Sequence, residues 1–280
     1  GEISAHIWSE HLPWIEGVGV GAIVQVIGTV EDYKGRRQLK LTAPLRVVAT
    51  AAANLDEFLP AIAVDPEKLW SRIDQWRGQM SAGLRRPVDL FFADDAFREL
   101  FQRVPGAPRG HHAQIGGLLL HVVEVGNIAR NAAKTMRGNV NLVTAGALLH
   151  DIGKVEAYSI GPMGFDQTPA GRLLGHVVLG SLMLDARLAT LPPGTITADQ
   201  RLELHHFVQS HHGLVEFGAA VMPMTLEAEL LHHADQASAK GNDFNEAGDD
   251  PDLFPAEEAF SVRESWRLKR RVWRRTHRWD

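Results

Sequence analysis

The chain has 280 residues, enough for one large or two moderate domains, and its 45% hydrophobic and 22% charged residues are ordinary for a globular protein. A formal net charge of −5 argues against a protein that coats nucleic acid over its whole surface, so any nucleic-acid contact is expected to be local. The absence of cysteine excludes disulfides, thiolate zinc sites and cysteine nucleophiles, and it fits a cytoplasmic location. No apolar run approaches the ~18–20 residues that span a bilayer, so no membrane association is expected.

Residues 1–60 have the pattern of short β-strands. Apolar and polar residues alternate over 3–7, which predicts a half-buried strand. Further strands are predicted over 22–30 and 38–42, with Lys34-Gly35 as a hairpin turn between them. Short strands separated by glycine-containing turns favour a small β-barrel. The first residue of the chain already lies within this pattern, so the first strands of the barrel are expected to precede it.

Helices are predicted after residue 60. Asp65-Pro66 is a typical helix start, with the aspartate as N-cap and the proline at the first helical position. Gly83 and Pro87 are expected to interrupt the helical pattern, and a second helix is expected to begin near Asp94. Residues 61–105 are therefore predicted to be a helical connector.

The remaining sequence divides into a helical domain and a tail. Residues 106–245 contain apolar-periodic segments broken by glycine and proline, which predict helices and no strands. Asp243–Glu258 is acidic and predicted to be a loop or linker, and Arg263–Arg278 is basic with interleaved tryptophans. Residues 246–280 thus form an acidic linker and a basic tail. An RNA-contacting element, a partner-binding helix and a poorly ordered end are the alternatives for the tail.

Several histidines and aspartates of the helical domain are candidate metal ligands. A lone histidine on an apolar helix is more often a hydrogen-bonded core residue, but burying several of them is costly unless a shared ion satisfies them. Neutral imidazoles and carboxylates suit Mn, Fe, Co or Zn. His150 and Asp151 end a helix before Gly153, where they can face one ion, and the two oxygens of an aspartate can bridge two ions. The candidates are His121, His150, Asp151, His176, His211, His212 and Asp235.

The order of these residues resembles the pattern H…HD…H…H…D of the HD superfamily of metal-dependent phosphohydrolases. The HD pair of this chain stands in an intact His-Asp-Ile-Gly-Lys sequence at 150–154. The resemblance implies four ligands for a first divalent ion: His121, His150, Asp151 and Asp235. It implies a second ion held by Asp151 as the bridge, His176, and one or both of His211 and His212. Mn²⁺ is the expected ion, with Mg²⁺, Co²⁺ and Fe²⁺ as alternatives.

Other residues near this series are candidates for substrate contact. Lys154, three residues after Asp151, is expected to bind or neutralise a substrate phosphate, with a solvated lysine as the alternative. Asp151 and Lys154 are therefore the catalytic candidates. Arg172 is a second phosphate-binding candidate. His111 and His112 are expected to line the pocket, with a capping role or a role beside the ligands as the alternative.

The resemblance extends to YhaM-type 3′→5′ exoribonucleases, which join an OB-fold to an HD domain. It covers roughly residues 1–245. The segments that carry it are HHAQIGGLLLH (111–121), AGALLHDIGK (145–154), GRLLGH (171–176), SHHG (210–213), MPMTLEAE (222–229), GEISAHIW (1–8) and YKGRRQLK (33–40). The implied fold class is multidomain α+β, with a partial OB-fold β-barrel in 1–60 followed by an all-α HD-domain helical bundle in 106–245.

The resemblance implies a metal-dependent 3′→5′ exoribonuclease that hydrolyses single-stranded RNA to nucleoside 5′-monophosphates by a metal-activated water. Single-stranded DNA is a second candidate substrate. An OB-fold tracks single strands with cations and stacking residues, so Lys34, Arg36 and Arg37 are substrate-binding candidates, with a solvated hairpin face as an equal alternative. The competing functions are a nucleotidase or cyclic-nucleotide phosphodiesterase of the HD type, a di-iron oxygenase and an inactive nucleic-acid-binding scaffold. The oligomeric state is open, a homo-oligomer included.

Overall fold

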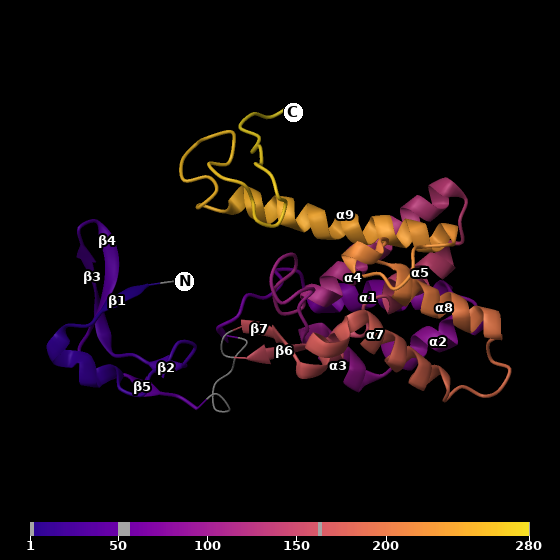
Figure 1. Ribbon diagram of the computed structural model, residues 1–280, viewed down its shortest axis with the longest axis horizontal. Helices are drawn as coiled ribbons and strands as arrows, with labels where there is room; N and C mark the ends of the chain where they lie inside the picture. The colour runs from indigo at the N-terminus through magenta and orange to yellow at the C-terminus, as the bar shows by residue number, and fades with distance from the viewer. Residues whose placement is uncertain (1–2, 50–56, 162–163, 280) are drawn as a thin grey trace. The chain divides into compact units, whose positions relative to one another are not determined.

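The computed structural model describes residues 3–49, 57–161 and 164–279, without the side chain of Arg36. The chain divides into two compact units. One comprises Gly1–Leu59 with Gly161–Gly164, and the other comprises Pro60–Ile160 with Phe165–Asp280. Figure 1 labels the helices and strands of each unit.

The N-terminal unit consists of short strands and one 3₁₀ helix. Its elements are β1 (Ser4–His6), η1 (Ser9–Ile15), β2 (Val24–Gln25), β3 (Gly28–Tyr33), β4 (Arg36–Leu41) and β5 (Arg46–Val47). The predicted turn at Lys34-Gly35 is confirmed, because both residues have positive φ (54° and 77°), as a two-residue type I′ hairpin requires. Asp32 stabilises this turn by accepting a 2.9 Å hydrogen bond from the Gly35 backbone N–H.

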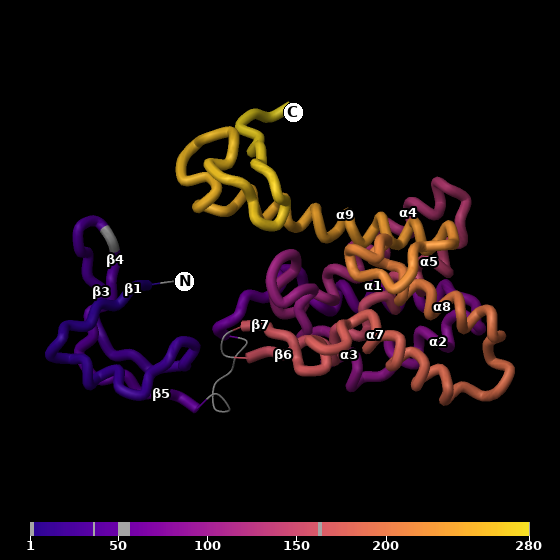
Figure 2. The backbone as a smooth tube through the Cα atoms, in the orientation of Figure 1, coloured from indigo at the N-terminus to yellow at the C-terminus, as the bar shows by residue number. Residues whose placement is uncertain are grey.

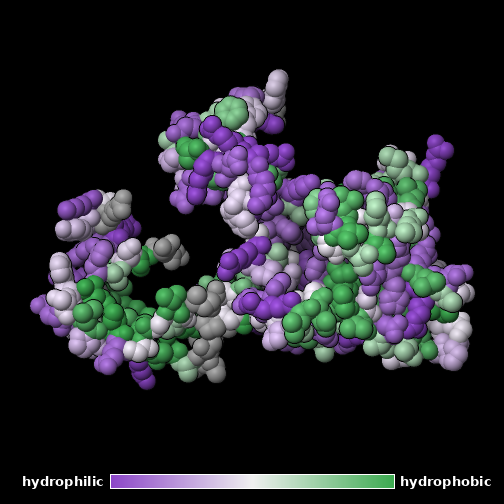
Figure 3. Space-filling model, in the orientation of Figure 1, coloured by the Kyte–Doolittle hydropathy of each residue, from purple (hydrophilic) through white to green (hydrophobic). Residues whose placement is uncertain are grey.

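The strands of this unit form two separate sheets. One has the order β1-β4-β3, with β1 parallel to β4, and the other pairs β2 with β5. Within residues 3–49 these sheets do not close into the predicted barrel. The predicted half-burial of the first strand is also wrong: Ile3 is 45% exposed and all of β1 is exposed. Figure 3 shows hydrophobic side chains (green) on the surface of this unit.

The second unit is mainly helical. Its helices are α1 (Pro66–Gln79), α2 (Ala82–Phe92), α3 (Asp95–Arg103), α4 (Gly117–Met136), α5 (Val140–Leu149), α6 (Lys154–Ala157), α7 (Pro169–Leu188), α8 (Ala198–Ser210) and α9 (Leu226–Asp249), with a 3₁₀ turn η4 (Val215–Phe217). The predicted helix starts are confirmed, because the Asp65 and Asp94 carboxylates accept hydrogen bonds from the first backbone N–H groups of α1 and α3. No described helix combines the length and apolar character that a membrane span requires.

Three local predictions for this unit are wrong. Gly83 and Pro87 both lie inside α2 instead of interrupting the helical pattern. Burial of Val88, Phe91 and Phe92, at about 1.5–3 kcal/mol each, outweighs the ~3 kcal/mol cost of an interior proline. A two-stranded sheet, β6 (Tyr158–Gly161) and β7 (Gly164–Gln167), interrupts the region predicted to be all-helical. Helix α9 continues to Asp249 through the first half of the predicted acidic loop, because Ala247 packs on the segment that follows.

Helix α4 lies at the centre of the second unit. It packs against α5 and α9 (Figure 1), and α7 packs against α6 and α8. Apolar residues of α1 to α5, α7 and α8 form one core, which includes the aromatic group Trp70, Phe92, Phe97 and Phe101. A second core joins α4, α5, α8 and α9. The ends of α5 and α8, the first turns of α4 and the middle of α9 meet in one region.

Residues 250–279, the C-terminal segment, fold back on the end of α9 without a helix or strand of their own (Figure 2). Leu253, Phe254 and Val272 bury their side chains against Ala247 of α9. Isolated β-bridges join Phe260 to Trp273 and Ser265 to Arg270. Of the alternatives for this tail, a helix is therefore wrong.

Candidate metal centre

The centre is built around the end of helix α5. His150 is the C-cap of this helix, and its Nδ1 is 2.8 Å from the carbonyl oxygen of Ala147 one turn earlier. This bond turns Nε2 away from the helix, towards the carboxylate of Asp151 at 3.1 Å. Both side chains are almost completely buried. The adjacent pair therefore converges at the helix end, as the sequence predicts.

The two oxygens of Asp151 face different imidazoles. Oδ2 lies 3.1 Å from Nε2 of His150 and 3.5 Å from Nε2 of His121. Oδ1 lies 3.4 Å from Nε2 of His176 and 3.6 Å from Nε2 of His211. This carboxylate thus lies between two groups of nitrogen atoms.

Two groups of side chains can each hold an ion. His121 of α4, His150 of α5 and Asp235 of α9 form one, and within it His121 Nε2 lies 3.1 Å from Asp235 Oδ1. His176 of α7 forms the other with His211 and His212, which follow α8. In each group the potential ligand atoms lie within 4.8 Å of one another. All seven candidate ligands predicted from the sequence are therefore brought together around Asp151.

Several buried polar atoms around Asp151 have no hydrogen-bond partner, and such atoms indicate whether a metal ion fits the centre. Among the described residues, those that face this centre include Nε2 of His121, His150, His176 and His211, Nδ1 of His212, and Oδ1 of Asp151. A buried polar atom without a partner is costly, and this many around one point is unusual for a native protein. Divalent ions coordinated by imidazole and carboxylate would satisfy all of them. The residues present therefore fit a two-ion centre.

Neighbouring groups hold these imidazoles in the orientation that ligation needs. Nδ1 of His211 is 2.9 Å from the Val208 carbonyl oxygen, and Nδ1 of His121 is 3.0 Å from the hydroxyl of Ser238. A proton on Nδ1 leaves the lone pair of Nε2 for the centre. The Ser238 hydroxyl donates at 2.7 Å to Glu124, so its own lone pair can accept from His121.

The charges of the centre favour a bound cation. Burial raises the pKa of Asp151, but the charges of His150 and Lys154 hold it well below the usual range. Burial lowers the pKa of His121, but the neighbouring carboxylates of Asp151 and Asp235 raise it above its usual value. The carboxylates that favour a proton on His121 also favour a divalent cation at the same point. Burial lowers the pKa of His176 to about 3, so this imidazole is neutral at pH 7 and able to bind a metal.

Lys154 is buried beside the bridging carboxylate. Its Nζ lies 2.6 Å from Asp151 Oδ2, and the residue is only 6% exposed, so the solvated alternative is wrong. Burial lowers the pKa of Lys154, but the charge of Asp151 raises it above its usual value. The ammonium therefore carries a full charge next to the centre. It also faces the cavity that opens over the ligands.

Glycines allow the close packing around the centre. A Cβ on Gly153 would overlap the carbonyl oxygen of His176 and the backbone of Gly180 in α7. Gly175 has φ 74° and ψ 159° inside α7, which kinks the helix directly before His176. Gly213 has φ 80°, and a Cβ there would overlap the His232 ring. That ring bonds through Nδ1 to the carbonyl oxygen of His211 at 2.9 Å.

A cavity of about 390 Å³ opens over the ligands. Its lining comprises Gly106, Ala107, His111, Asp151, Lys154, Tyr158, His176, His212, Phe217, Asp235, Gln236, Ala239 and Lys240. His111 therefore lies where the sequence analysis expects it, and burial together with the Lys154 charge lowers its pKa to about 3. His112 is fully buried and does not line the cavity; its Nε2 lies 3.1 Å from Glu124.

Arg172, a further substrate-binding candidate of the helical unit, does not line this cavity. Arg172 is exposed on α7, and its guanidinium donates to both oxygens of Asp166 at 2.8 Å. Lys34 and Arg37 are exposed on the β3–β4 hairpin of the N-terminal unit. The side chain of Arg36 lies outside the described part of the structure.

Several residues of the centre are not predicted from the sequence. Glu124 and Ser238 orient His121, while Tyr158, Gln236 and Lys240 line the cavity. Ser238 lies three residues after Asp235 on α9, so helical spacing alone could have indicated it. Glu124 lies three residues after His121 on α4 in the same way. Tyr158 begins strand β6, which the helical pattern did not predict.

Comparison with known proteins agrees with this arrangement. The family model described as HD domain matches residues 118–240, the region that holds all seven candidate ligands. The 3′-5′ exoribonuclease YhaM of Bacillus subtilis (strain 168) is 33% identical over 243 residues, which cover 86% of this chain and 76% of the relative. The chain belongs to the YhaM family.

Two other YhaM-family relatives are similarly close. The 3′-5′ exoribonuclease YhaM of Bacillus velezensis (strain DSM 23117 / BGSC 10A6 / LMG 26770 / FZB42) is 32% identical over 86% of this chain and 75% of its own. The protein of the same name from Listeria monocytogenes serotype 4b (strain CLIP80459) is 31% identical over 86% of this chain and 76% of its own. No solved structure is significantly similar to this YhaM-family chain.

Proposed function

We propose that this chain is a 3′-5′ exoribonuclease that acts on single-stranded RNA through two divalent ions held on either side of Asp151. Membership of a family whose relatives are named 3′-5′ exoribonucleases makes it a hydrolytic phosphodiesterase. The observation that supports the two-ion centre is the placement of the Asp151 oxygens. Oδ2 faces His121 and His150, and Oδ1 faces His176 and His211.

Each ion would have its own ligands in addition to the shared carboxylate. His121, His150 and Asp235 would hold the first, and His176, His211 and His212 would hold the second. Such ions polarise a phosphoryl oxygen, lower the pKa of water and stabilise charge on the attacking and leaving oxygens. Mn²⁺ is the proposed ion, because mixed imidazole and carboxylate ligation without thiolate suits it.

The protein's own residues would bind and orient the scissile phosphate. Lys154 keeps its positive charge beside the centre and can neutralise a phosphate oxygen in the cavity. Neutral His111 can offer one N–H donor and one lone pair to a terminal nucleotide without adding a charge. Lys240 is exposed at the edge of the same cavity, where it can bind the next phosphate. The products would be nucleoside 5′-monophosphates.

The N-terminal unit would bind the strand as part of an OB-fold. Tyr33 is 56% exposed on the β3–β4 hairpin, with Lys34 Nζ 5.3 Å from its ring centre. An exposed ring beside cations is the combination that sequence-tolerant binding of single strands uses. Lys34, Arg36 and Arg37 would follow the RNA backbone. Single-stranded DNA is a second candidate substrate, and a cytoplasmic location stays a prediction.

The test is hydrolysis of a 5′-labelled single-stranded RNA in Mn²⁺. The expected result is a ladder that shortens from the 3′ end, and its loss in the Asp151→Ala variant. Asp199→Ala, on the exposed surface of α8, is the matched control and should hydrolyse RNA like the unchanged chain. Hydrolysis of mononucleotides without shortening of RNA would overturn the proposed substrate. Full activity of Asp151→Ala would overturn the proposed centre.

A further inference from the structure

The C-terminal segment concentrates positive charge in a chain that is negative overall. Between 263 and 279 the sequence has seven arginines, one lysine and a single acidic residue, against a net charge of −5 for the whole chain. The surface over this segment is hydrophilic with a few hydrophobic side chains among it (Figure 3). Trp266, Trp273 and Trp279 are all exposed there.

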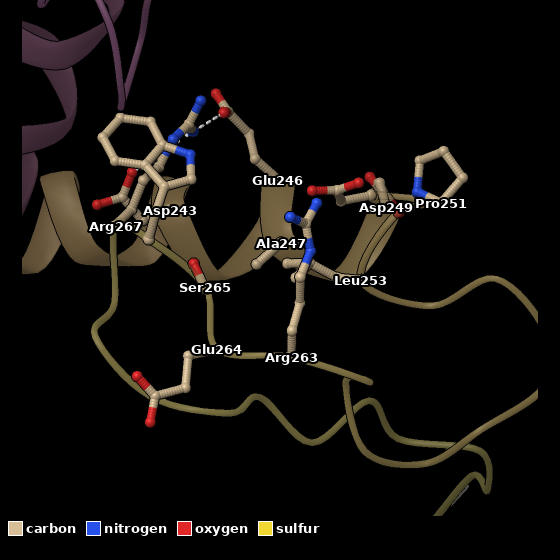
Figure 4. Close-up of a pocket in the computed structure, with 12 residues that line it drawn as sticks. Asp243, Glu246, Ala247, Asp249, Pro251, Leu253, Arg263, Glu264, Ser265 and Arg267 are labelled. Carbon is tan, nitrogen blue, oxygen red and sulfur yellow. Dashed lines mark hydrogen bonds and ion pairs between the residues drawn. The ribbon is translucent and has the colours of Figure 1, made fainter.

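Two of these arginines form ion pairs within the protein. Arg267 pairs with Glu246 and, at 3.6 Å, with Asp243, and Arg263 pairs with Asp252 at 3.5 Å. Figure 4 shows the cavity of about 420 Å³ that these side chains line, with Arg263 and Arg267 extending from the C-terminal segment towards acidic residues of α9. Ion pairs thus fasten the segment to the last turns of α9, and this acidic cavity is unsuited to a polyanion.

The other exposed cations of the segment form no ion pair with a carboxylate in the part of the chain that the structure describes. Among the described residues, none of the following has a carboxylate partner: Lys269, Arg270, Arg271, Arg275 and Arg278. Unpaired cations held on a folded backbone attract an anionic chain without first giving up an internal ion pair.

A second cavity, of about 590 Å³, joins these cations to aromatic rings. It is lined by Phe244, Asn245, Gly248, Asp249, Val272, Trp273, Arg274 and Arg275. Trp273 is 49% exposed and Phe244 is 43% exposed, and Arg270 lies 5.6 Å from the centre of the Phe244 ring. Exposed rings beside arginines are the groups on which bases of a single strand stack. Asp249 is the single carboxylate of the lining, against two arginines.

Helix α9 connects this cavity to the metal centre. Asp235, Gln236 and Lys240 line the catalytic cavity, and Phe244 and Gly248 line the second one. Positions 236, 240, 244 and 248 follow one another at intervals of four, so they form one slowly winding stripe on the helix. With a rise of ~1.5 Å per residue, Phe244 lies roughly 14 Å along the axis from Asp235, a distance that a few nucleotides span.

We propose that the C-terminal segment and the last turns of α9 form a second binding site for single-stranded RNA, which holds the strand a few nucleotides from the end being hydrolysed. A base stacks in the cavity between Phe244 and Trp273, and Arg270 and Arg275 bind the neighbouring phosphates. The site rests on the proposed exoribonuclease function, since it needs a strand longer than a mononucleotide.

The test is the affinity of the full chain for a fluorescein-labelled single-stranded RNA, measured by anisotropy in EDTA so that no hydrolysis occurs. Trp273→Ala should weaken binding about fivefold to a hundredfold, the range for loss of one stacked base. Arg270→Gln with Arg275→Gln should weaken binding and lower the slope of log affinity against log salt by about 1.4, which is ~0.7 for each phosphate contact to a single strand.

The matched control neutralises two exposed cations elsewhere, Arg72 of α1 and Lys134 of α4, and should leave affinity and salt slope unchanged. Circular dichroism checks that Trp273→Ala is folded. If Trp273→Ala is unfolded, the arginine variant still tests the site, because it is altered only at exposed positions. RNA affinities equal to that of the unchanged chain in both variants would overturn the second site. Variants that keep their RNA affinity but lose binding to anionic lipid vesicles would also overturn it. Failure of the proposed function is separate: the unchanged chain would then neither bind nor shorten RNA.

Discussion

Ser238 links a candidate metal ligand to a carboxylate on another helix. Its hydroxyl donates to Glu124 at 2.7 Å and lies 3.0 Å from Nδ1 of His121. Burial raises the pKa of Glu124, but hydrogen bonds from His112 and Ser238 lower this pKa below its usual value. A carboxylate that stays charged keeps the serine oriented, and the serine keeps the His121 proton on Nδ1.

Ser238→Ala should therefore weaken Mn²⁺ binding by about 10- to 100-fold, the usual cost of removing a group that orients a metal ligand. The measurement is calorimetric titration of Mn²⁺ into the metal-free chain, which does not depend on activity. Glu124→Gln should have a smaller effect, because the amide oxygen can still accept from Ser238. Ser181→Ala, which removes a hydroxyl bonded to Gln209 away from the centre, is the control. Unchanged affinity in Ser238→Ala would show that His121 needs no such support.

Buried histidines also make the metal-free chain sensitive to acid. Burial, with the charge of Lys154, lowers the pKa of His111 to about 3, and burial lowers that of His176 to about 3. In the unfolded chain their pKa is ~6.5. Between these values the unfolded state binds a proton that the folded state does not, so stability is complete above pH ~6.5 and falls as the pH falls towards 3.

Each such histidine should lower the free energy of unfolding by about 1.4 kcal/mol per pH unit, or by about 2 kcal/mol between pH 6.5 and 5. Urea unfolding in EDTA at these two pH values measures the loss. His111→Gln should lose about 2 kcal/mol less than the unchanged chain over the same interval. An equal loss in both proteins would mean that His111 is not held neutral in the folded state.

At the scale of elements, the contact between the end of α5 and helix α7 sets the spacing of the two ligand groups. Gly153 lies where a Cβ would overlap the backbone of His176 and Gly180. Gly153→Ala must therefore push α7 outwards and move His176 away from Asp151. Gly78→Ala in α1 has open space around the added Cβ and is the matched control.

Gly153→Ala should lower the thermal midpoint and reduce the number of bound Mn²⁺ ions from two to one, because only the group that contains His176 is displaced. Gly78→Ala should bind two ions and gain roughly 0.5–1 kcal/mol, since alanine is the better helix former. Two-ion binding with normal affinity in Gly153→Ala would mean that α7 tolerates the shift without moving its ligand.

The elements that could be predicted from the sequence depend on local chemistry. Asp65 and Asp94 mark helix starts because capping needs only the next few residues, and Lys34-Gly35 marks a turn through its own backbone angles. The order of the candidate ligands could be read in the same way, from a motif. Helix α2 continues through Pro87 because of tertiary packing, which no local rule contains. Contacts such as Glu124–Ser238 join residues 114 positions apart and depend on how α4 and α9 pack.

At the scale of the whole molecule, the groups that would bind RNA outside the metal-centre cavity lie at the two ends of the sequence. The N-terminal unit carries Lys34, Arg36, Arg37 and Lys40 on one hairpin, and the C-terminal segment carries its own unpaired cations. All candidate metal ligands belong to the second unit. Cutting the chain between the units should therefore leave metal binding intact and remove only the strand contacts of the N-terminal unit.

A chain that begins at Pro60 should bind two Mn²⁺ ions like the full chain, because it retains every candidate ligand and both cores of the helical unit. Its affinity for single-stranded RNA should fall, and its salt slope should decrease by up to about 3, at ~0.7 for each of the four lost hairpin cations. Anisotropy across a salt series, beside calorimetry with Mn²⁺, measures both. Equal RNA affinity and salt slope in the two proteins would remove the N-terminal unit from the strand-binding surface and leave the strand to the cations of the second unit, since a net negative chain needs local cations to hold RNA.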